Sequence, residues 1–146
     1  MKTLLNKILE DYETEEFAKK IGTEKHIKMQ EIIIDSDLEN GDKSLINHIK
    51  QNKELLPFFS KKSKTEVPIA GYINGTFVSR RIDRLIIKDE EIQFIDYKTD
   101  TNKDKFKDKY IEQLKEYNLL LKDIYKDKKI SGYILWLTDF TLEKVI

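Results

Sequence analysis

Residues 94–100 read Phe-Ile-Asp-Tyr-Lys-Thr-Asp and end an apolar run that begins at residue 91. Asp96 and Lys98 are two positions apart, so on a strand both side chains point to one face, about 6–7 Å apart. Thirteen positions upstream, Asp83 interrupts a second apolar run. Two carboxylates and a lysine on one side of a sheet are costly in a hydrophobic core. They suit a divalent metal ion beside a phosphate.

The sequence around these acids has the pattern of a β-meander. Residues 65–70, 76–88 and 91–98 are short runs rich in β-branched or aromatic residues. Turn residues separate them, including Asn74-Gly75 and Asp89-Glu90, and this alternation of runs and turns is typical of hairpins. We therefore expect three consecutive strands, with Asp83 in the second and Asp96 near the end of the third.

Helical periodicity lies on both sides of the meander. Residues 3–34 predict a helix in two pieces, because Gly22-Thr23 interrupts the pattern and Thr23 can cap the second piece. The first piece carries Leu4, Leu5, Ile8, Leu9 and Tyr12 at helical spacing. Ser44 can cap a further helix that reaches residue 56. Residues 105–126 return to helical spacing, and residues 130–138 form an apolar run typical of a strand buried on both faces.

The predicted order of elements is therefore α-α-β-β-β-α-β, and residues 142–146 can add an edge strand. This order indicates an α/β (α+β) fold in which helices flank a small mixed β-sheet. A chain of 146 residues fits one domain, residues 1–146, and is long enough to bury a core.

Composition excludes several classes of protein. Lys plus Arg and Asp plus Glu both number 27, so the net charge is zero and any surface that attracts phosphate must be local. The absence of Cys excludes disulfides, a cysteine-zinc site and an iron–sulfur cluster. No apolar run is long enough to span a membrane, and the amino terminus lacks the apolar part of a signal peptide. We expect a soluble cytoplasmic protein with no membrane partner.

Asp83, Asp96 and Lys98 are the centre of the predicted site. The two carboxylates can bind Mg²⁺ or Mn²⁺, and the backbone carbonyl of Tyr97 can supply a further oxygen. An ion held there neutralises charge on a phosphodiester and lowers the pKa of its water. Lys98 can orient the attacking water or stabilise charge in the transition state.

Ordinary ion pairs are the alternative for these charged residues. Asp83 can pair with Arg81 or Arg84. Asp96 can likewise pair with Lys98, since most charges at strand ends are simply solvated. Because both acids follow apolar runs, we favour the active-site interpretation.

Other polar side chains can complete the site. His26 can add a nitrogen ligand, although a lone histidine on a helix is more often an ordinary surface or half-buried residue. Glu66 can add a further carboxylate, directly or through water, and is equally compatible with a solvated strand start. Gln113 and Tyr117 lie one helical turn apart and can contact phosphate or hydrogen-bond the lysine. Tyr110 lies near them. The two tyrosines can also be core aromatics beside neighbouring leucines.

A lysine-rich segment, residues 99–109, precedes the last predicted helix. Its lysines would project toward a DNA backbone if the segment borders the cleft, and they are Lys103, Lys105, Lys107 and Lys109. A solvated loop is the alternative, because Asp100, Asp104 and Asp108 partly cancel the positive charge.

Taken in order, these motifs resemble the PD-(D/E)xK nuclease superfamily, and most of all its RecB/AddA-type exonuclease domains. The matching segments are Gly22-Thr23-x-x-His26, Glu66-Val67-Pro68, Arg81-Ile82-Asp83, Ile95-Asp96-Tyr97-Lys98-Thr99-Asp100 and Tyr110-x-x-Gln113-Leu114-x-x-Tyr117. The resemblance implies a restriction-endonuclease-like core. It further implies that the metal ligands are His26, Asp83, Asp96 and the Tyr97 carbonyl, that Lys98 is catalytic, and that Gln113 with Tyr117 forms the motif of this branch.

The resemblance implies a metal-dependent DNA nuclease, an exonuclease of double-strand-break repair or recombination. Its substrate would be single-stranded DNA or DNA with free ends, and a helicase or other repair subunit would be a partner. Since the sequence has no Walker A loop, we expect distributive, sequence-indifferent cleavage without ATP. The alternatives are a non-catalytic DNA- or partner-binding module with a nuclease-like fold, and a structure-specific endonuclease.

Overall fold

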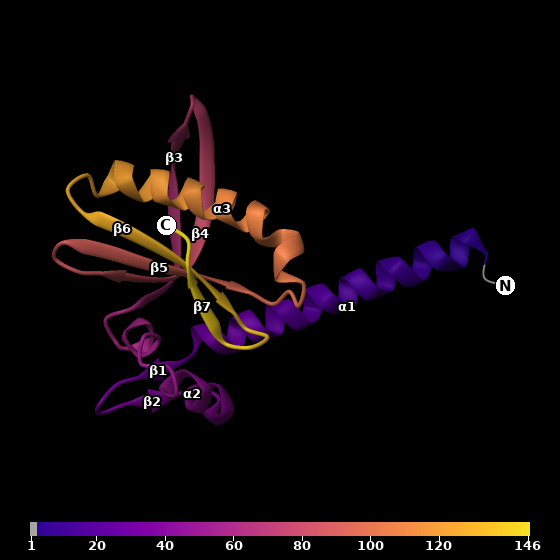
Figure 1. Ribbon diagram of the computed structural model, residues 1–146, viewed down its shortest axis with the longest axis horizontal. Helices are drawn as coiled ribbons and strands as arrows, with labels where there is room; N and C mark the ends of the chain where they lie inside the picture. The colour runs from indigo at the N-terminus through magenta and orange to yellow at the C-terminus, as the bar shows by residue number, and fades with distance from the viewer. Residues whose placement is uncertain (1–2) are drawn as a thin grey trace.

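The computed structural model describes residues 3–146, without the side chains of residues 10–21. Its centre is a five-stranded sheet in the order β3-β4-β5-β6-β7 (Figure 1). The strands are β3 (Lys64–Ile73), β4 (Thr76–Ile87), β5 (Glu91–Lys98), β6 (Lys129–Trp136) and β7 (Thr141–Lys144). Neighbouring strands are antiparallel except for β5 and β6, which are parallel. The mixed sheet flanked by helices confirms the predicted fold class.

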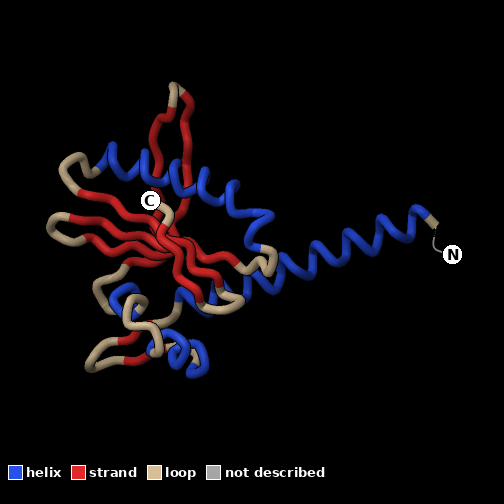
Figure 2. The backbone as a smooth tube through the Cα atoms, in the orientation of Figure 1, coloured by secondary structure: helices blue, strands red, loops and turns tan. Residues whose placement is uncertain are grey.

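Helices cover both faces of this sheet (Figure 2). Helix α3 (Lys103–Ile124) joins the parallel strands and packs on one face. The end of α1 (Leu4–Gln30), with α2 (Lys43–Lys50) and the 3-10 helix η1 (Leu56–Phe59), packs on the other. Within the described part of the chain, no helix is long and apolar enough to cross a membrane.

The amino-terminal helix differs from the prediction of two pieces. Helix α1 runs unbroken, and Gly22 and Thr23 lie inside it. Its N-cap is Thr3. A glycine inside a helix costs only about 1 kcal/mol relative to alanine, which a helix of 27 residues can absorb. Tyr12, part of the predicted apolar pattern, lies among the residues whose side chains are not described.

The segment between α1 and the sheet also differs in detail. Asp42, not Ser44, caps α2, because its carboxylate accepts the Leu45 N–H at 3.1 Å. The helix ends at Lys50 instead of residue 56. A short hairpin of β1 (Ile33–Ile34) and β2 (Glu39–Asn40), which the sequence did not predict, precedes it. The predicted edge strand forms as β7.

Strand β4 positions the candidate site because it leaves the sheet. It pairs with β3 along nearly its whole length, but with β5 only from Arg84 to Ile87. On the amino-terminal side of Arg84, β4 has no pairing with β5, and the β3–β4 hairpin therefore projects from the sheet (Figure 1). Its turn is Asn74-Gly75, as predicted, with φ of 51° and 78°, and such positive values are those of a tight two-residue hairpin turn.

Candidate active site

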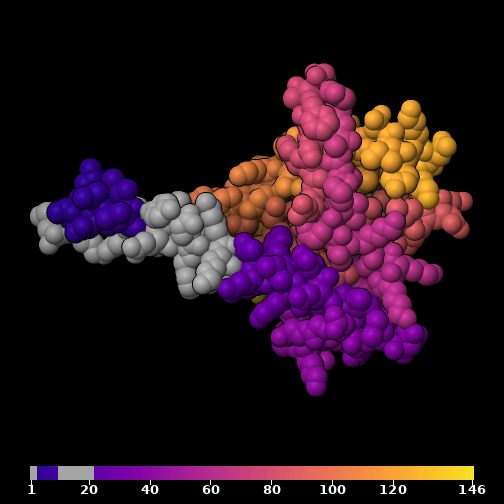
Figure 3. Space-filling model, turned by 180° about the vertical axis from the view of Figure 1, so that it is seen from behind, coloured from indigo at the N-terminus to yellow at the C-terminus, as the bar shows by residue number. Residues whose placement is uncertain are grey.

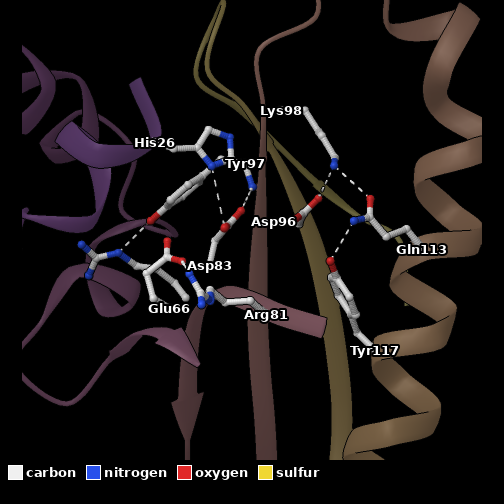
Figure 4. Close-up of polar contacts among 10 residues, drawn as sticks. His26, Glu66, Arg81, Asp83, Asp96, Tyr97, Lys98, Gln113 and Tyr117 are labelled. Carbon is white, nitrogen blue, oxygen red and sulfur yellow. Dashed lines mark hydrogen bonds and ion pairs between the residues drawn. The ribbon is translucent and has the colours of Figure 1, made fainter. Parts of the chain in front are cut away.

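Two acids lie where β4 and β5 separate. Asp83 directly precedes Arg84, the first residue of β4 that pairs with β5, and Asp96 directly follows Ile95, the last residue of β5 that pairs with β4. Their exposed fractions are 8% and 4%. The Tyr97 backbone N–H donates to Asp83 Oδ2 at 2.7 Å, so a side chain replaces a carbonyl as acceptor between the two strands (Figure 4). The fork between the strands thus brings together two carboxylates that are 13 residues apart in sequence.

The environment of these acids disfavours two negative charges. Burial raises the pKa of Asp83, and the nearby charge of Asp96 raises it further. The hydrogen bond from Tyr97 acts in the opposite direction but is the weaker influence. Since like charges in a poorly solvated site cannot both ionise cheaply, the pair favours either a retained proton or a bound cation.

Lys98 is held beside Asp96 by three contacts. Its Nζ lies 2.8 Å from Asp96 Oδ2 and donates to Gln113 Oε1 at 2.9 Å. It also lies 4.1 Å from the centroid of the Tyr110 ring. The tyrosine is itself held by a hydrogen bond that its hydroxyl donates to Asp100. The amine therefore has a defined position next to the two acids, and the pairing of Asp96 with Lys98 exists within the site.

Gln113 connects the lysine to the hydrophobic core. Because a lysine can only donate, its contact fixes Oε1 as the acceptor and leaves the amide nitrogen to donate. That nitrogen donates to the Tyr117 hydroxyl at 2.8 Å. Tyr117 is 3% exposed and packs edge-on against Phe94. The tyrosine thus has both of the roles considered from sequence, as a core aromatic and as a hydrogen-bonding partner of the site.

His26 and Glu66 approach Asp83 from the other side of the fork (Figure 4). His26 Nδ1 lies 3.8 Å from Asp83 Oδ1, and burial lowers the pKa of this histidine. Glu66 Oε2 lies 3.8 Å from Arg81 Nη1. The backbone of Glu66 has φ of 52°, a strained value for a residue with a side chain. The four residues line a hollow of about 560 Å³.

A second hollow, also about 560 Å³, lies beside Lys98 and Gln113. Its other walls include Tyr110, Arg80 and Lys109. One hollow thus reaches Asp83 from the α1 side, and the other reaches Lys98 from the α3 side. The two acids at the fork lie between them, so an extended substrate can occupy both hollows and pass the carboxylates.

The donor set fits a metal ion that keeps much of its water. Among the residues with described side chains, no three His, Asp or Glu side chains are arranged to hold an ion. Two carboxylates remain, and Asp96 Oδ2 is buried without an aligned hydrogen-bond donor, although Lys98 lies 2.8 Å away. Magnesium commonly uses one or two carboxylates and several waters, so Asp83 and Asp96 suffice for it.

Arg84 has a role that the sequence did not indicate. The alternative in which Asp83 pairs with Arg81 or Arg84 is wrong, because Arg81 contacts Glu66 and Arg84 donates to Tyr97 and to backbone carbonyls instead. The Arg84 guanidinium donates to the Tyr97 hydroxyl at 2.8 Å. It also donates to the Met29 carbonyl at 2.8 Å and to other backbone carbonyls of the α1 and η1 region. The sequence signal was an arginine inside a buried apolar run.

The lysine-rich segment lies mostly away from the acids. Residues from Lys103 onward form the first turns of α3, not a loop. Lys103 pairs with Asp139 at 2.6 Å, and Lys107 pairs with Glu143 at 2.5 Å. These carboxylates belong to the β6–β7 region and neutralise both lysines. The ion pairs of these two lysines favour the alternative of a solvated charge run, while Lys109 lines the hollow beside Lys98.

The motif at the fork also agrees with the comparison to known families. Asp96-Tyr97-Lys98 follows the pattern acid, any residue, lysine, and Ile82 stands before the other acid, Asp83. No curated protein matches the chain. A family model, however, matches residues 4–143, which is nearly the whole chain and includes every residue of the site. The chain belongs to the PD-(D/E)XK nuclease superfamily.

Proposed function

We propose that this protein is a metal-dependent deoxyribonuclease that hydrolyses phosphodiester bonds, and that it acts as an exonuclease. The observation that carries the proposal is the fork. Two buried carboxylates meet there, and a lysine fixed by a glutamine lies beside them. Membership of the superfamily supports nuclease chemistry. Phosphodiester hydrolysis needs the negative charge of the transition state to be stabilised, and this site offers cationic groups for that purpose.

Asp83 and Asp96 are the proposed carboxylate ligands of Mg²⁺ or Mn²⁺. The Tyr97 carbonyl and His26 are further proposed ligands of the ion, and Glu66 is a further candidate, directly or through water. A divalent ion bound there would neutralise charge on the phosphate and make a nearby water more acidic. The chain's own contribution is to hold the two carboxylates together against their repulsion, which the Tyr97 N–H does at Asp83.

Lys98 is the proposed catalytic cation, and Gln113 with Tyr117 positions it. An ammonium group has three donors, and the hydrogen bond to Gln113 uses one of them. A donor directed at a phosphate oxygen stabilises the charge that develops in the transition state. The chain of contacts from Lys98 to the buried Tyr117 keeps the amine in place, which limits the reorganisation needed during the reaction.

The exonuclease assignment, with a role in double-strand-break repair or recombination, rests on the Gln113-x-x-x-Tyr117 motif and its contact with Lys98. The proposed substrate is single-stranded DNA or DNA with free ends, in the cytoplasm, with a helicase or another repair subunit as partner. A non-catalytic DNA-binding module is the second candidate. It is favoured by the lack of a three-side-chain metal group among the described residues.

Digestion of end-labelled DNA separates these functions. Linear and circular DNA, single- and double-stranded, are incubated with Mg²⁺ or Mn²⁺ and with wild type, Asp96→Asn or Lys98→Ala. The control is Asp89→Asn, since Asp89 is exposed in the connection between β4 and β5, at the opposite end of these strands from the two acids. We expect linear DNA alone to be degraded, and only by wild type and the control.

The other outcomes identify the alternatives. Cuts in closed circles would indicate an endonuclease. DNA binding without cleavage in any metal would indicate a non-catalytic module. Lys98→Ala should lose cleavage but retain metal and DNA binding, because it removes a group that acts mainly in the transition state.

A further inference from the structure

Two large aromatic side chains are exposed at the tip of the β3–β4 hairpin. Tyr72 is 74% exposed and Phe77 is 60% exposed. They are directly opposite each other in the strand register, with ring centroids 5.6 Å apart at an interplanar angle of 67°. The hairpin that carries them projects from the body of the molecule (Figure 3). Exposed aromatic residues in contact with each other call for a physical explanation, since water disfavours them.

The two faces of the hairpin differ. Ile69, Ile73 and Val78 pack into the core between the sheet and α3. Because successive side chains of a strand alternate, Tyr72 and Phe77 lie on the opposite face, which α3 does not cover. The exposure pattern of β3 follows this alternation, with every second residue from Pro68 to Tyr72 exposed. The aromatic pair therefore belongs to an open face of the sheet.

This open face leads to the candidate active site. On β4, every second residue from Phe77 through Ser79 to Arg81 has its side chain on this same face of the strand. Arg81 has a side chain that is 70% exposed, and it lines the hollow that contains Asp83 and His26. The exposed face thus begins at the acids and continues without interruption to the aromatic tip.

The charge along the hairpin suits a polyanion. Between Val67 and Ile82 the chain has two arginines and no carboxylate, although 37% of all its residues are charged. Arg80 contacts Glu116 on the α3 side, and Arg81 Nη1 lies 3.8 Å from Glu66 Oε2. The open face therefore presents the exposed Arg81 guanidinium between the aromatic tip and the acids, and the carboxylates beside it, Glu66 and Asp83, belong to the site itself.

The spacing matches several nucleotides. Phe77 and Asp83 are six positions apart on β4, which corresponds to about 20 Å at the rise of a strand. Stacked nucleotides advance about 3.4 Å each along one strand. The aromatic tip therefore lies about six nucleotides away from a phosphate held at the acids.

We propose that the open face of the β3–β4 hairpin binds a single-stranded segment of the substrate. Tyr72 and Phe77 stack on a base about six nucleotides from the reacting phosphate, and Arg81 pairs with a backbone phosphate between them. Stacking on aromatic side chains does not depend on base identity, so the surface adds binding affinity without sequence preference. This inference rests on the proposed nuclease function, because it assigns that function a single-stranded substrate path.

A purely structural role for the pair predicts a different result. Cross-strand aromatic pairs stabilise hairpins, and exposed aromatics also occur where proteins bind each other. Neither role requires a base. The decisive comparison is therefore between a normal 12-mer of thymidine and an abasic 12-mer, which keeps the phosphates and lacks the bases.

The test measures dissociation constants by fluorescence anisotropy in EDTA, where cleavage cannot interfere. The variants are Tyr72→Val/Phe77→Val, which keeps β-branched residues suited to a strand, and Tyr72→Trp/Phe77→Trp, which keeps aromatic rings. Leu119→Val, at a position 54% exposed on α3, is the surface control. We expect the valine variant to bind the thymidine 12-mer about 5- to 150-fold more weakly, the factor that one stacked base represents.

Binding of the abasic strand should not change in the valine variant, and the tryptophan variant and the control should bind both strands like wild type. Equal losses for both strands, no loss for either, or a wild type that does not prefer the normal strand would each overturn the proposal. Failure of the nuclease function appears separately, as DNA that stays intact with metal while the difference between the two strands persists.

Discussion

Asp83 and Arg84 are consecutive on β4 and both are buried, yet their surroundings are opposite. The Arg84 guanidinium donates hydrogen bonds to the Tyr97 hydroxyl and to the carbonyls of Met29 and Ile32. It also lies 4.2 Å from the centroid of the Phe59 ring. Asp83 accepts a hydrogen bond from the Tyr97 N–H, but burial raises its pKa and the neighbouring charge of Asp96 raises it further.

The difference separates a structural charge from a functional one. Backbone carbonyls in the last turn of α1 have no partners within the helix, and they form the negative end of its dipole. Arg84 satisfies them, so its burial ties the helix to the sheet. The two acids at the fork keep their repulsion and an oxygen without an aligned donor. Repulsion between buried charges that the protein does not compensate is typical of functional sites.

The largest expected effect comes from changing the functional acid. Asp96→Asn should reduce cleavage by a factor on the order of 10³ or more, since the charge stabilisation by a bound metal is worth several kcal/mol. The same variant should be at least as stable as wild type without metal, because one of two repelling carboxylates is gone. Initial rates on single-stranded DNA and thermal unfolding in EDTA measure the two quantities. A variant that is inactive because it is unfolded would contradict the comparison.

The structural charge should give the reverse result. Arg84→Met should destabilise the fold by about 3–5 kcal/mol, since it leaves several buried carbonyls and the Tyr97 hydroxyl without their donor. The matched control is Arg80→Met, which removes an exposed ion pair with Glu116 and should cost at most about 1 kcal/mol. Urea unfolding of both variants provides the measurement. Similar free energies of unfolding for the two would show that Arg84 does not connect α1 to the sheet.

Local signals predicted most of the fold. The strands near residues 76–88 and 91–98, the turn at Asn74-Gly75 and the long helix near residues 105–126 all form close to their predicted limits. Each depends on a pattern of neighbouring residues, which a sequence displays directly. The unbroken α1 was missed because glycine is a weak helix breaker whose effect depends on context.

The candidate site was only partly predictable for the same reason. Asp96 and Lys98 share a strand, so their contact follows from the alternation of side chains. The partners of Arg84 lie up to 55 residues away in sequence, and its direction depends on how β4 leaves the sheet. The separation of β4 from β5 after Arg84 is a feature of register that residue types do not specify. It nevertheless decides which of two adjacent charges faces the site.

Divalent metal should relieve the repulsion between the acids. At about 100 times its dissociation constant, Mn²⁺ would stabilise the folded protein by about 2.7 kcal/mol. Wild type should therefore melt at a higher temperature with Mn²⁺ than with EDTA, and Asp96→Asn should not. Arg84→Lys, which keeps the positive charge but removes the guanidinium donors away from the acids, should retain the metal response. An equal response of wild type and Asp96→Asn would place the ion elsewhere.

The pH dependence of stability should also distinguish the functional acid from the structural charges. The pKa of Asp83 is raised in the folded protein by burial and by Asp96, so the folded state holds a proton that the unfolded state has released. Stability without metal should therefore fall as pH rises from about 4, the value for an unfolded aspartate. The slope approaches about 1.4 kcal/mol per pH unit when one proton is involved.

Asp83→Asn should remove this part of the slope, whereas Arg80→Met should keep it. The comparison is made by urea unfolding in EDTA at pH values from about 5 to about 8, in steps of about one unit. A flat profile for wild type would mean that the acids do not repel each other in the folded protein.

The smallest expected effect concerns backbone strain at Glu66. Its φ of 52° lies in the left-handed region, which glycine adopts without a steric penalty. Glu66→Gly should therefore be more stable than Glu66→Ala by about 1 kcal/mol, although glycine ordinarily weakens a strand. The matched pair at Ala70 of the same strand, wild type against Ala70→Gly, should show the ordinary order, in which alanine is the more stable residue. Urea unfolding resolves this difference if the slopes of the four proteins agree. If glycine is the less stable residue at both positions, the backbone at Glu66 is not strained. The site would then differ from the rest of the fold in its charges and not in its backbone.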